Sequence, residues 1–383
     1  MTRESRRWWS VLWLASLLVA VACRDGSSTP PLVIATVTTT SGAVPTATTA
    51  APTTTAVPMS AGTWRDYPGI PLASAGSRLA AAWTDRGLFV WVGGGPQDAA
   101  LLDLATGTWR ATVSSGLAAR DAAIAVSTGS EVIVWGGKTV GHRGEGPAGA
   151  IYDASRDVWR VLPPAPIGLR NADAAVVWTG REMLVWSGTE EGVTARPSGA
   201  AYDPQAYAWR TLPDAPIDPR SEAAVVWTGR ELLVWGGLGV PGDGAAYDPS
   251  ANTWRVLAKA PLGSRIANAV WTGTEMVIRA GRSGNGNGVF AYSNAAAYNP
   301  ATDTWRQLAD GPAHPGFQAV WTGQGLLMFA KGSGVRFTSE TGWQDLPHAG
   351  FTVPTEGTVV WTGREAVLAG VVSSRIAVVS YTP

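Results

Sequence analysis

The sequence predicts an all-β protein, a seven-bladed β-propeller with four strands in each blade. The first observation is a recurrent Trp-Thr-Gly step, which starts at Trp178, Trp227, Trp271, Trp321 and Trp361 and has variants at Trp83 and Ser127. The second observation is a later tryptophan in each repeat, mostly within Thr-Trp-Arg, found at Trp64, Trp109, Trp159, Trp209, Trp254, Trp305 and Trp343. Successive copies lie roughly 40 to 50 residues apart, which is the period of propeller blades.

The repeat over residues 222–261 illustrates the four strands expected of one blade. Residues 223–227 are small and apolar, which suits an inner strand packed on both faces. A turn at 228–230 leads to a second strand over 231–235, which the Gly236-Gly237 pair ends. A variable loop precedes a third strand over 244–247, and the turn residues 248–252 precede a fourth over 253–257.

Constant spacings within the repeats predict a fixed strand register. Most repeats have a tyrosine seven residues before the Thr-Trp-Arg tryptophan, at Tyr152, Tyr202, Tyr247 and Tyr298, and Leu102 takes this place before Trp109. The two tryptophans of the first hairpin are also eight residues apart in three repeats. A residue required once in every blade is a packing residue, so we assign the tryptophans of the repeats to the core and not to a ligand platform.

The strand order, the glycine pair, the third-strand tyrosine and the fourth-strand tryptophan resemble the kelch repeat. The resemblance covers residues 62–383 and is best in the units that contain Gly136-Gly137 and Gly236-Gly237. It is weaker in the sixth unit, where Lys331 replaces the second glycine and no tyrosine precedes Trp343. It is also weaker in the seventh unit, where we expect Ala369-Gly370 to end the second strand.

The two ends of the repeat region predict how the ring closes. Trp64 belongs to a fourth strand with nothing before it, and the last unit, residues 358–381, has three strands and no fourth. The N-terminal strand can therefore complete the C-terminal blade and leave no free sheet edge. Six complete units and one shared unit give seven blades.

The N-terminal residues predict an export signal. Arg3, Arg6 and Arg7 precede an apolar run over 8–22 that is too short to span a bilayer comfortably. The small residues before Cys23 resemble the bacterial lipoprotein signal, which implies cleavage after residue 22 and a lipid on the Cys23 thiol. Two acyl chains on one residue suffice for stable anchoring. The alternatives are an ordinary cleaved signal and a buried unpaired cysteine, and the paired arginines leave general and twin-arginine export both open.

Three segments follow from this composition. Residues 1–22 are the expected signal peptide, and residues 23–60, rich in Thr, Pro and Ala, are an expected disordered tether because they have little apolar surface to bury. Residues 61–383 are the expected propeller. We therefore expect a lipid-anchored protein on the extracytoplasmic face of the cell membrane.

Charge and cysteine content exclude some classes of function. The chain has no net charge, so it lacks the basic surface that nucleic-acid binding requires. Cys23 is the only cysteine, which excludes an intrachain disulfide or a Cys-X-X-Cys redox pair. We expect a monomer without a cofactor or a metal.

Function is expected on the face that carries the variable loops. Five arginines stand just before inner strands and two histidines stand nearby in the last repeats: Arg78, Arg120, Arg170, Arg220, Arg265, His314 and His348. Their position resembles that in animal kelch domains, where such arginines bind acidic peptides, and a guanidinium matches a carboxylate well. The alternative is that each arginine pairs with an acidic neighbour, such as Asp121, Asp173 or Glu222, and links adjacent blades. The arginines of the Thr-Trp-Arg steps lie on outer strands, where we expect solvated side chains.

The sequence lacks residues that some enzymes with this fold require. The copper radical oxidases that resemble galactose oxidase need a Tyr-Cys crosslink and histidine ligands, but Cys23 lies in the signal, and His142, His314 and His348 lie in loops of different repeats. Residues 103–109 resemble the Asp-box of sialidases, which is a structural turn. We therefore predict a binding module for an unknown protein or glycan, with an anionic ligand as the working hypothesis.

The alternative is a small-molecule enzyme of the channel, such as a sialic-acid mutarotase or another glycan-active enzyme, which needs few residues and no cofactor. An arginine and a carboxylate facing each other in a polar channel would favour the enzyme. Exposed aromatic side chains on the loops would favour the binding module.

Overall fold

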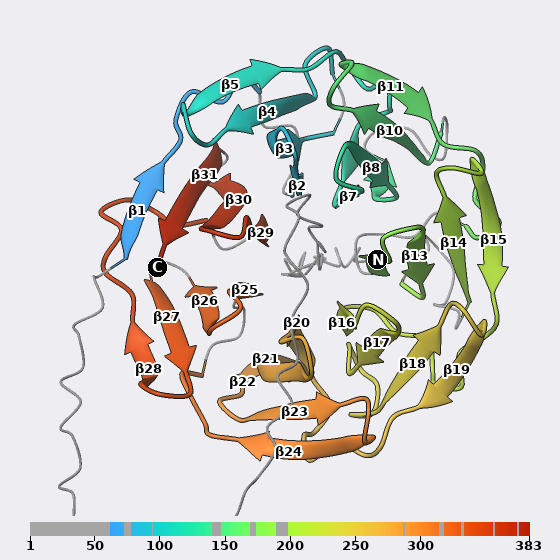
Figure 1. Ribbon diagram of the computed structural model, residues 1–383, viewed down its shortest axis with the longest axis vertical. Coiled ribbons are helices and arrows are strands. Elements are labelled where there is room, and N and C mark those ends of the chain that lie inside the picture. Colours follow the sequence, from blue (N-terminus) through green and yellow to red (C-terminus); the bar gives the residue numbers. More distant parts are fainter. Residues whose placement is uncertain are drawn as a thin grey trace, which may run out of the picture.

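The described part of the chain forms a ring of seven four-stranded antiparallel blades (Figure 1). The computed structural model describes residues 62–72, 78–93, 95–139, 147–168, 174–188, 198–285, 288–313, 318–330, 333–354, 357–373 and 375–383. Within these ranges no helix is long and apolar enough to cross a membrane. The predicted fold class and blade number are confirmed. The expected signal and the whole of the expected tether, including Cys23, lie outside the described residues.

In six blades the strands follow chain order from the centre of the ring outward, and in the seventh the N-terminal strand takes the outermost place. The first three blades comprise β2 (Ala80–Thr84), β3 (Gly87–Trp91), β4 (Ala99–Asp103) and β5 (Thr108–Ala111); β7 (Ile124–Ser127), β8 (Glu131–Trp135), β10 (Gly149–Asp153) and β11 (Val158–Val161); β12 (Ala175–Trp178), β13 (Met183–Trp186), β14 (Gly199–Asp203) and β15 (Ala208–Leu212). A short ribbon beside the second blade pairs β6 (Arg120–Asp121) with β9 (Lys138–Thr139).

The remaining blades repeat this order, with one addition in the fifth. They comprise β16 (Ala224–Trp227), β17 (Leu232–Trp235), β18 (Gly244–Asp248) and β19 (Thr253–Val256); β20 (Ile266–Trp271), β21 (Met276–Asn285), β23 (Ala295–Asn299) and β24 (Thr304–Leu308); β25 (Gln318–Trp321), β26 (Leu326–Ala330), β27 (Ser333–Thr338) and β28 (Gly342–Asp345); β29 (Gly357–Trp361), β30 (Ala366–Val372), β31 (Arg375–Thr382) and β1 (Thr63–Asp66). In the fifth blade β22 (Gly288–Ala291) pairs with the extended end of β21.

The inner strands form a closed circuit around the centre. β2, β7, β12, β16, β20, β25 and β29 each contact the next, and β29 contacts β2. Small and β-branched residues dominate these strands; Ala80, Ala81 and Ala82, for example, are at most 3% exposed. Small side chains are needed here because seven sheets converge on one axis.

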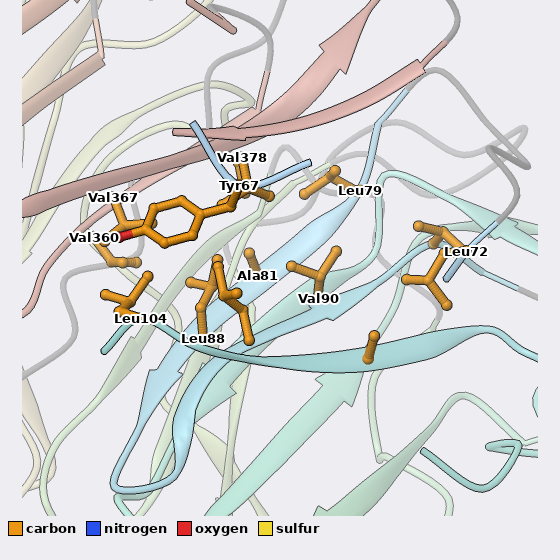
Figure 2. Packing of buried hydrophobic residues seen from close by; sticks show 14 residues of the cluster. Tyr67, Leu72, Leu79, Ala81, Leu88, Val90, Leu104, Val360, Val367 and Val378 are labelled. Carbon is orange, nitrogen blue, oxygen red and sulfur yellow. The ribbon is translucent and has the colours of Figure 1, made fainter. Parts of the chain in front are cut away.

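The N-terminal strand closes the ring as predicted. β1 pairs with β31, with Trp64 opposite Tyr381. The Trp64 indole lies 5.0 Å from the Tyr381 ring and 5.8 Å from that of Phe329, and its Nε1 donates to the Pro347 carbonyl at 2.8 Å. Tyr67, just after β1, then packs between the seventh and first blades beside Val360 (Figure 2). The two ends of the chain therefore share one core.

The predicted register within blades is confirmed. Tyr152, Tyr202, Tyr247 and Tyr298 each lie directly opposite the tryptophan seven residues later, as in the Tyr247–Trp254 pair, whose rings are 5.0 Å apart. In the sixth blade Phe337 takes the tyrosine position and lies 4.8 Å from Trp343. One expectation is wrong: Ala369-Gly370 does not end the second strand of the last blade, because β30 pairs with β31 as far as Val372.

Tryptophans also join neighbouring blades. Trp135, Trp186 and Trp235 of the second strands lie 5.5–6.0 Å from the fourth-strand tryptophan of the following blade. The fourth-strand indoles donate to a backbone carbonyl of the preceding blade, in the pairs Trp109–Tyr67, Trp159–Val113, Trp209–Pro163, Trp254–Pro213, Trp305–Ala258 and Trp64–Pro347. The tryptophans therefore pack in the core, as predicted.

The arginines of the Thr-Trp-Arg steps, which lie on the outer strands, include side chains that bond to the next blade. Arg210 of the third blade bonds the Tyr247 hydroxyl of the fourth at 3.0 Å, and Arg255 bonds that of Tyr298 in the fifth at 2.9 Å. Arg255 also forms an ion pair with Glu231 of its own blade at 2.8 Å, which raises the pKa of the guanidinium. The expectation of free surface side chains is corrected here, because the third-strand tyrosine of the next blade offers a hydroxyl within reach.

Candidate functional site

The variable connections gather on one side of the ring, here called the loop face. It consists of the segments that precede each inner strand, such as 257–265, and the segments between second and third strands, such as 236–243. The tight turns between first and second strands, such as 228–231, lie on the opposite side, here called the turn face. Antiparallel pairing dictates this division, because each inner strand starts where its second strand ends.

Arg220 lies at the loop face, where its guanidinium bonds through Nε and Nη1 while Nη2 is buried without a hydrogen-bond partner. Its side chain is buried, and its Nη1 pairs with the Asp243 carboxylate at 2.8 Å and donates to the Gly236 carbonyl at 3.2 Å. Its backbone is bonded to the preceding blade, because its N–H donates to the Ser187 hydroxyl at 2.8 Å and its carbonyl accepts from Gly188 N at 3.1 Å. Arg220 therefore joins the loop of its own blade to the neighbouring blade.

Arg120 and Arg265 have similar surroundings and are each 2% exposed. Arg120 donates to the Pro147 carbonyl at 2.7 Å, and Arg265 to Asn294 Oδ1 at 2.7 Å. The Arg265 guanidinium also lies 3.9 Å from the centre of the Tyr292 ring. Burial lowers the pKa of both arginines, because a charged group loses solvation there.

The glycine pairs explain why these arginine backbones pack so closely. Gly237 N donates to the Arg265 carbonyl at 3.0 Å, and Gly237 has a φ of +125°. A Cβ on Gly237 would stand 2.8 Å from the Ser221 carbonyl oxygen, so a larger residue would push the blades apart. The glycine and the arginine of successive repeats thus meet at one junction.

The other predicted site residues do not form a complete ring with these three. Arg78 donates its backbone N–H to the Asp121 carboxylate at 3.1 Å, and His348 is exposed, with its Nδ1 accepting from Gly350 N at 3.0 Å. Arg170 and His314 lie outside the described residues. The guanidinium groups of Arg120, Arg220 and Arg265 bond to the loops of their own blades, and Arg220 pairs there with Asp243 and not with Glu222; the backbones of Arg220 and Arg265 make the bonds to the preceding blade. A ligand role for the seven residues stays a prediction.

Sequence reasoning missed an ion pair at the loop face. Arg282 of β21 pairs with Glu222, which precedes β16 in the neighbouring blade, at 2.8 Å. Both side chains are largely buried, and Glu222 has a φ of +53°, a backbone conformation uncommon outside glycine. Neither residue recurs at its repeat position, so the periodic pattern gave no signal for them.

A projecting hairpin was also missed. β21 continues past the sheet and pairs with β22, so that Ser283 lies opposite Phe290. The Phe290 side chain is 61% exposed, which is the highest value among the described large apolar residues. At its base the Tyr292 and Ser283 hydroxyls are 2.7 Å apart. The interval between the second strand and the third-strand tyrosine is longest in this repeat, and that length could have predicted the hairpin.

The described residues offer no donor set for a metal. Among them no three His, Cys, Asp or Glu side chains cluster closely enough to hold an ion. His348, the one histidine within the described ranges, lies on the exposed segment between the sixth and seventh blades. Copper prefers several such ligands in one place, so these residues do not fit a copper centre.

Comparisons with known proteins agree on the fold. No family model matches the sequence, and no curated protein matches it. Among solved structures, a fungal alcohol oxidase of the AA5 family in complex with copper is 15% identical with a TM-score of 0.65, over 84% of this chain and 76% of that one. The structure of YjhT is 14% identical with a TM-score of 0.51, over 81% of this chain and 99% of that one. At these identities the likeness concerns the fold alone, and the chain is a seven-bladed β-propeller.

Proposed function

We propose that this chain is a kelch-type propeller that binds a protein or glycan through its loop face while a lipid on Cys23 holds it at the extracytoplasmic side of the membrane. The repeat residues are occupied by packing and by bonds between blades, so they leave little for recognition. Loops on a rigid scaffold are the usual place for binding residues. The tether of residues 23–60 would give the propeller reach from the membrane.

The exposed Phe290 carries this proposal. Phe290 exposes its aromatic side chain on β22, the strand added to the fifth blade, and aromatic side chains are enriched in the contact sites of proteins. The hairpin is held from below by Tyr292, which contacts both Ser283 and Arg265. A hairpin that is held at its base loses less conformational freedom on binding, which favours affinity.

The experiment is a glycan and peptide array probed with the full-length protein and two matched variants. Phe290→Ser removes the exposed aromatic of the loop face, while Val256→Ser removes an apolar side chain that is 54% exposed on the outer strand β19. We expect signals that fall at least tenfold for Phe290→Ser and stay unchanged for Val256→Ser. Equal signals for all three proteins would contradict recognition by this hairpin.

A second candidate is a small-molecule enzyme of the channel, favoured by the Glu222–Arg282 pair. A carboxylate and a guanidinium 2.8 Å apart at the start of the inner strands could move a proton and hold an anionic sugar. The test is the anomer exchange of N-acetylneuraminate, followed by NMR with wild type and Glu222→Gln. Acceleration by the wild type that the variant loses would support this function, and no acceleration would exclude it for this substrate.

A further inference from the structure

A second candidate site lies away from the loop face, between the fifth and sixth blades. A cavity of about 290 Å³ opens there among residues of the turn face, including Glu275 and Gln324. Apolar and aromatic side chains form much of its wall, notably Trp321, Phe337 and Trp343. Its size is at the lower end of small-molecule pockets.

Arg279 breaks the repeat at this cavity. In the second, third and fourth blades the last residue of the second strand is a tryptophan that packs on the next blade's fourth-strand tryptophan. The equivalent residue of the fifth blade is Arg279, which lies opposite Ala295 within the longer strand β21, and its guanidinium lies 3.6 Å from the centre of the Trp343 ring. A charged side chain therefore replaces an indole inside a blade junction.

Arg279 also bonds to the carbonyl that, in other blade junctions, accepts a hydrogen bond from the fourth-strand indole. The carbonyl to which a fourth-strand indole donates is usually the one four residues after the preceding blade's tryptophan, as in the Trp305–Ala258 pair. The equivalent acceptor for Trp343 is Ala309, but Arg279 Nη1 donates to it at 3.3 Å. Trp343 Nε1 is buried without a hydrogen-bond partner. Both donors thus compete for one carbonyl, and the cavity beside them is lined by both residues.

The guanidinium is the unusual group here. Arg279 is 4% exposed, and it has no carboxylate within ion-pair distance among the described residues; Asp310 attracts it only from farther away. Its Nε and Nη2 have no hydrogen-bond partner. Burial lowers the pKa of Arg279 to about 10, so the group is still charged at neutral pH. A buried charge without a counter-ion is costly, whereas unpaired indoles also occur at Trp135 and Trp235 and carry no such cost in charge.

We propose that this cavity binds a small monocarboxylate, whose carboxylate pairs with Arg279 and whose apolar body lies against Trp321, Phe337 and Trp343. Arg279 lines the cavity, and the planar fork of a guanidinium matches the two oxygens of a carboxylate. Glu275 and Arg306 also line the cavity and pair with each other at 2.6 Å, so Arg279 leaves one net positive charge, which a monocarboxylate neutralises and a dianion such as a phosphate monoester exceeds. This site is independent of the loop face, so it can fail or succeed without the function proposed above.

The test uses ligand-observed fluorine NMR with the full-length protein. The probes are 3-(4-fluorophenyl)propionate, its neutral amide, and 6-fluorohexanoate, which has an alkyl body. We expect saturable binding of at least one carboxylate, and binding of the amide at least about tenfold weaker because the charged hydrogen bonds are lost. Absence of binding by both carboxylates, or equal binding of the propionate and its amide, would overturn the proposal.

Arg279→Trp is the informative variant because it restores the residue that other blades have. We expect it to fold, with a melting temperature at least equal to that of the wild type, and to lose carboxylate binding. Arg364→Gln removes an equal charge from an exposed turn of the seventh blade and should leave binding unchanged. Carboxylate binding that survives in a folded Arg279→Trp would also overturn the proposal. If Arg279→Trp fails to fold, Arg279→Gln is compared with wild type by the same criterion.

Discussion

Tyr207 occupies a position that neighbouring blades fill with an acid or amide. Asp157, Asn252 and Asp303 each lie five residues after a third-strand tyrosine and accept a hydrogen bond from its hydroxyl at 2.6–2.7 Å. In the third blade Tyr207 provides no such acceptor, and the buried Tyr202 hydroxyl has no hydrogen-bond partner. All four positions have φ between +50° and +56°, which asparagine and aspartate tolerate better than tyrosine.

Tyr207→Asn should therefore stabilise the protein. Satisfying the buried Tyr202 hydroxyl is worth about 1–3 kcal/mol, and relieving the backbone conformation adds up to about 1 kcal/mol. Against this, the variant loses the contact of the Tyr207 ring with Arg160 at 5.4 Å, worth about 0.5–1 kcal/mol, and a hydrogen bond to the Val161 carbonyl of similar size. The balance is a gain of about 1 kcal/mol, or roughly 1–2 °C in melting temperature for a domain of this size.

The assay is urea unfolding of the wild type, Tyr207→Asn, Tyr202→Phe and the double variant. Tyr202→Phe alone should be nearly neutral, because it removes a hydroxyl that has no partner. In that background the contribution of the Tyr202 hydroxyl is absent, so the effect of Tyr207→Asn should be less favourable by about 1–3 kcal/mol, which is the coupling between the two side chains. A lower midpoint for Tyr207→Asn, or a gain that is independent of Tyr202, would refute the reasoning.

Three further predictions concern the blade junctions and turns. Arg220→Ala should lower the free energy of unfolding by about 2–4 kcal/mol in urea titrations, since it breaks a buried pair; unchanged stability would instead favour a ligand role for this arginine. Gly237→Ala should cost at least about 1 kcal/mol more than Gly229→Ala, because both have positive φ but only Gly237 is crowded; equal melting temperatures would contradict this. A hydrogen bond from the Ser155 hydroxyl lowers the pKa of Asp153, so the Asp153 carboxylate stabilises the folded protein above pH 3.8, and this stabilisation is lost as the pH falls below that value. Asp153→Asn should therefore flatten the dependence of the urea midpoint on pH between about 5 and 2, and an unchanged slope would show that this carboxylate does not stabilise the turn.

The fold was predictable because its determinants recur. The Tyr247–Trp254 spacing implies two antiparallel strands in one register, and the structure has that register in each of the tyrosine-containing repeats. The unpaired strand at Trp64 likewise implied ring closure, because a free sheet edge is unfavourable. Strand ends were less certain where the glycine signal weakened, as at Gly370, which lies within β30.

The candidate sites were less predictable for the opposite reason. Glu222, Arg282 and Phe290 occur once each, so no periodic pattern marks them, and their meeting depends on how adjacent blades pack. Arg279 stands where other repeats have tryptophan, a departure that is visible in the sequence. Its meaning required the structure, because only there does the guanidinium emerge as buried and without a counter-ion.

Hydrogen exchange on the full-length protein, with and without the best ligand from the array, tests the central claim most directly. We predict slower exchange in the loop-face hairpin of residues 282–291 and in the segments before the inner strands, with no change in turns such as 228–231. Protection confined to the turn face, or to the outer strands, would contradict recognition through the loop face.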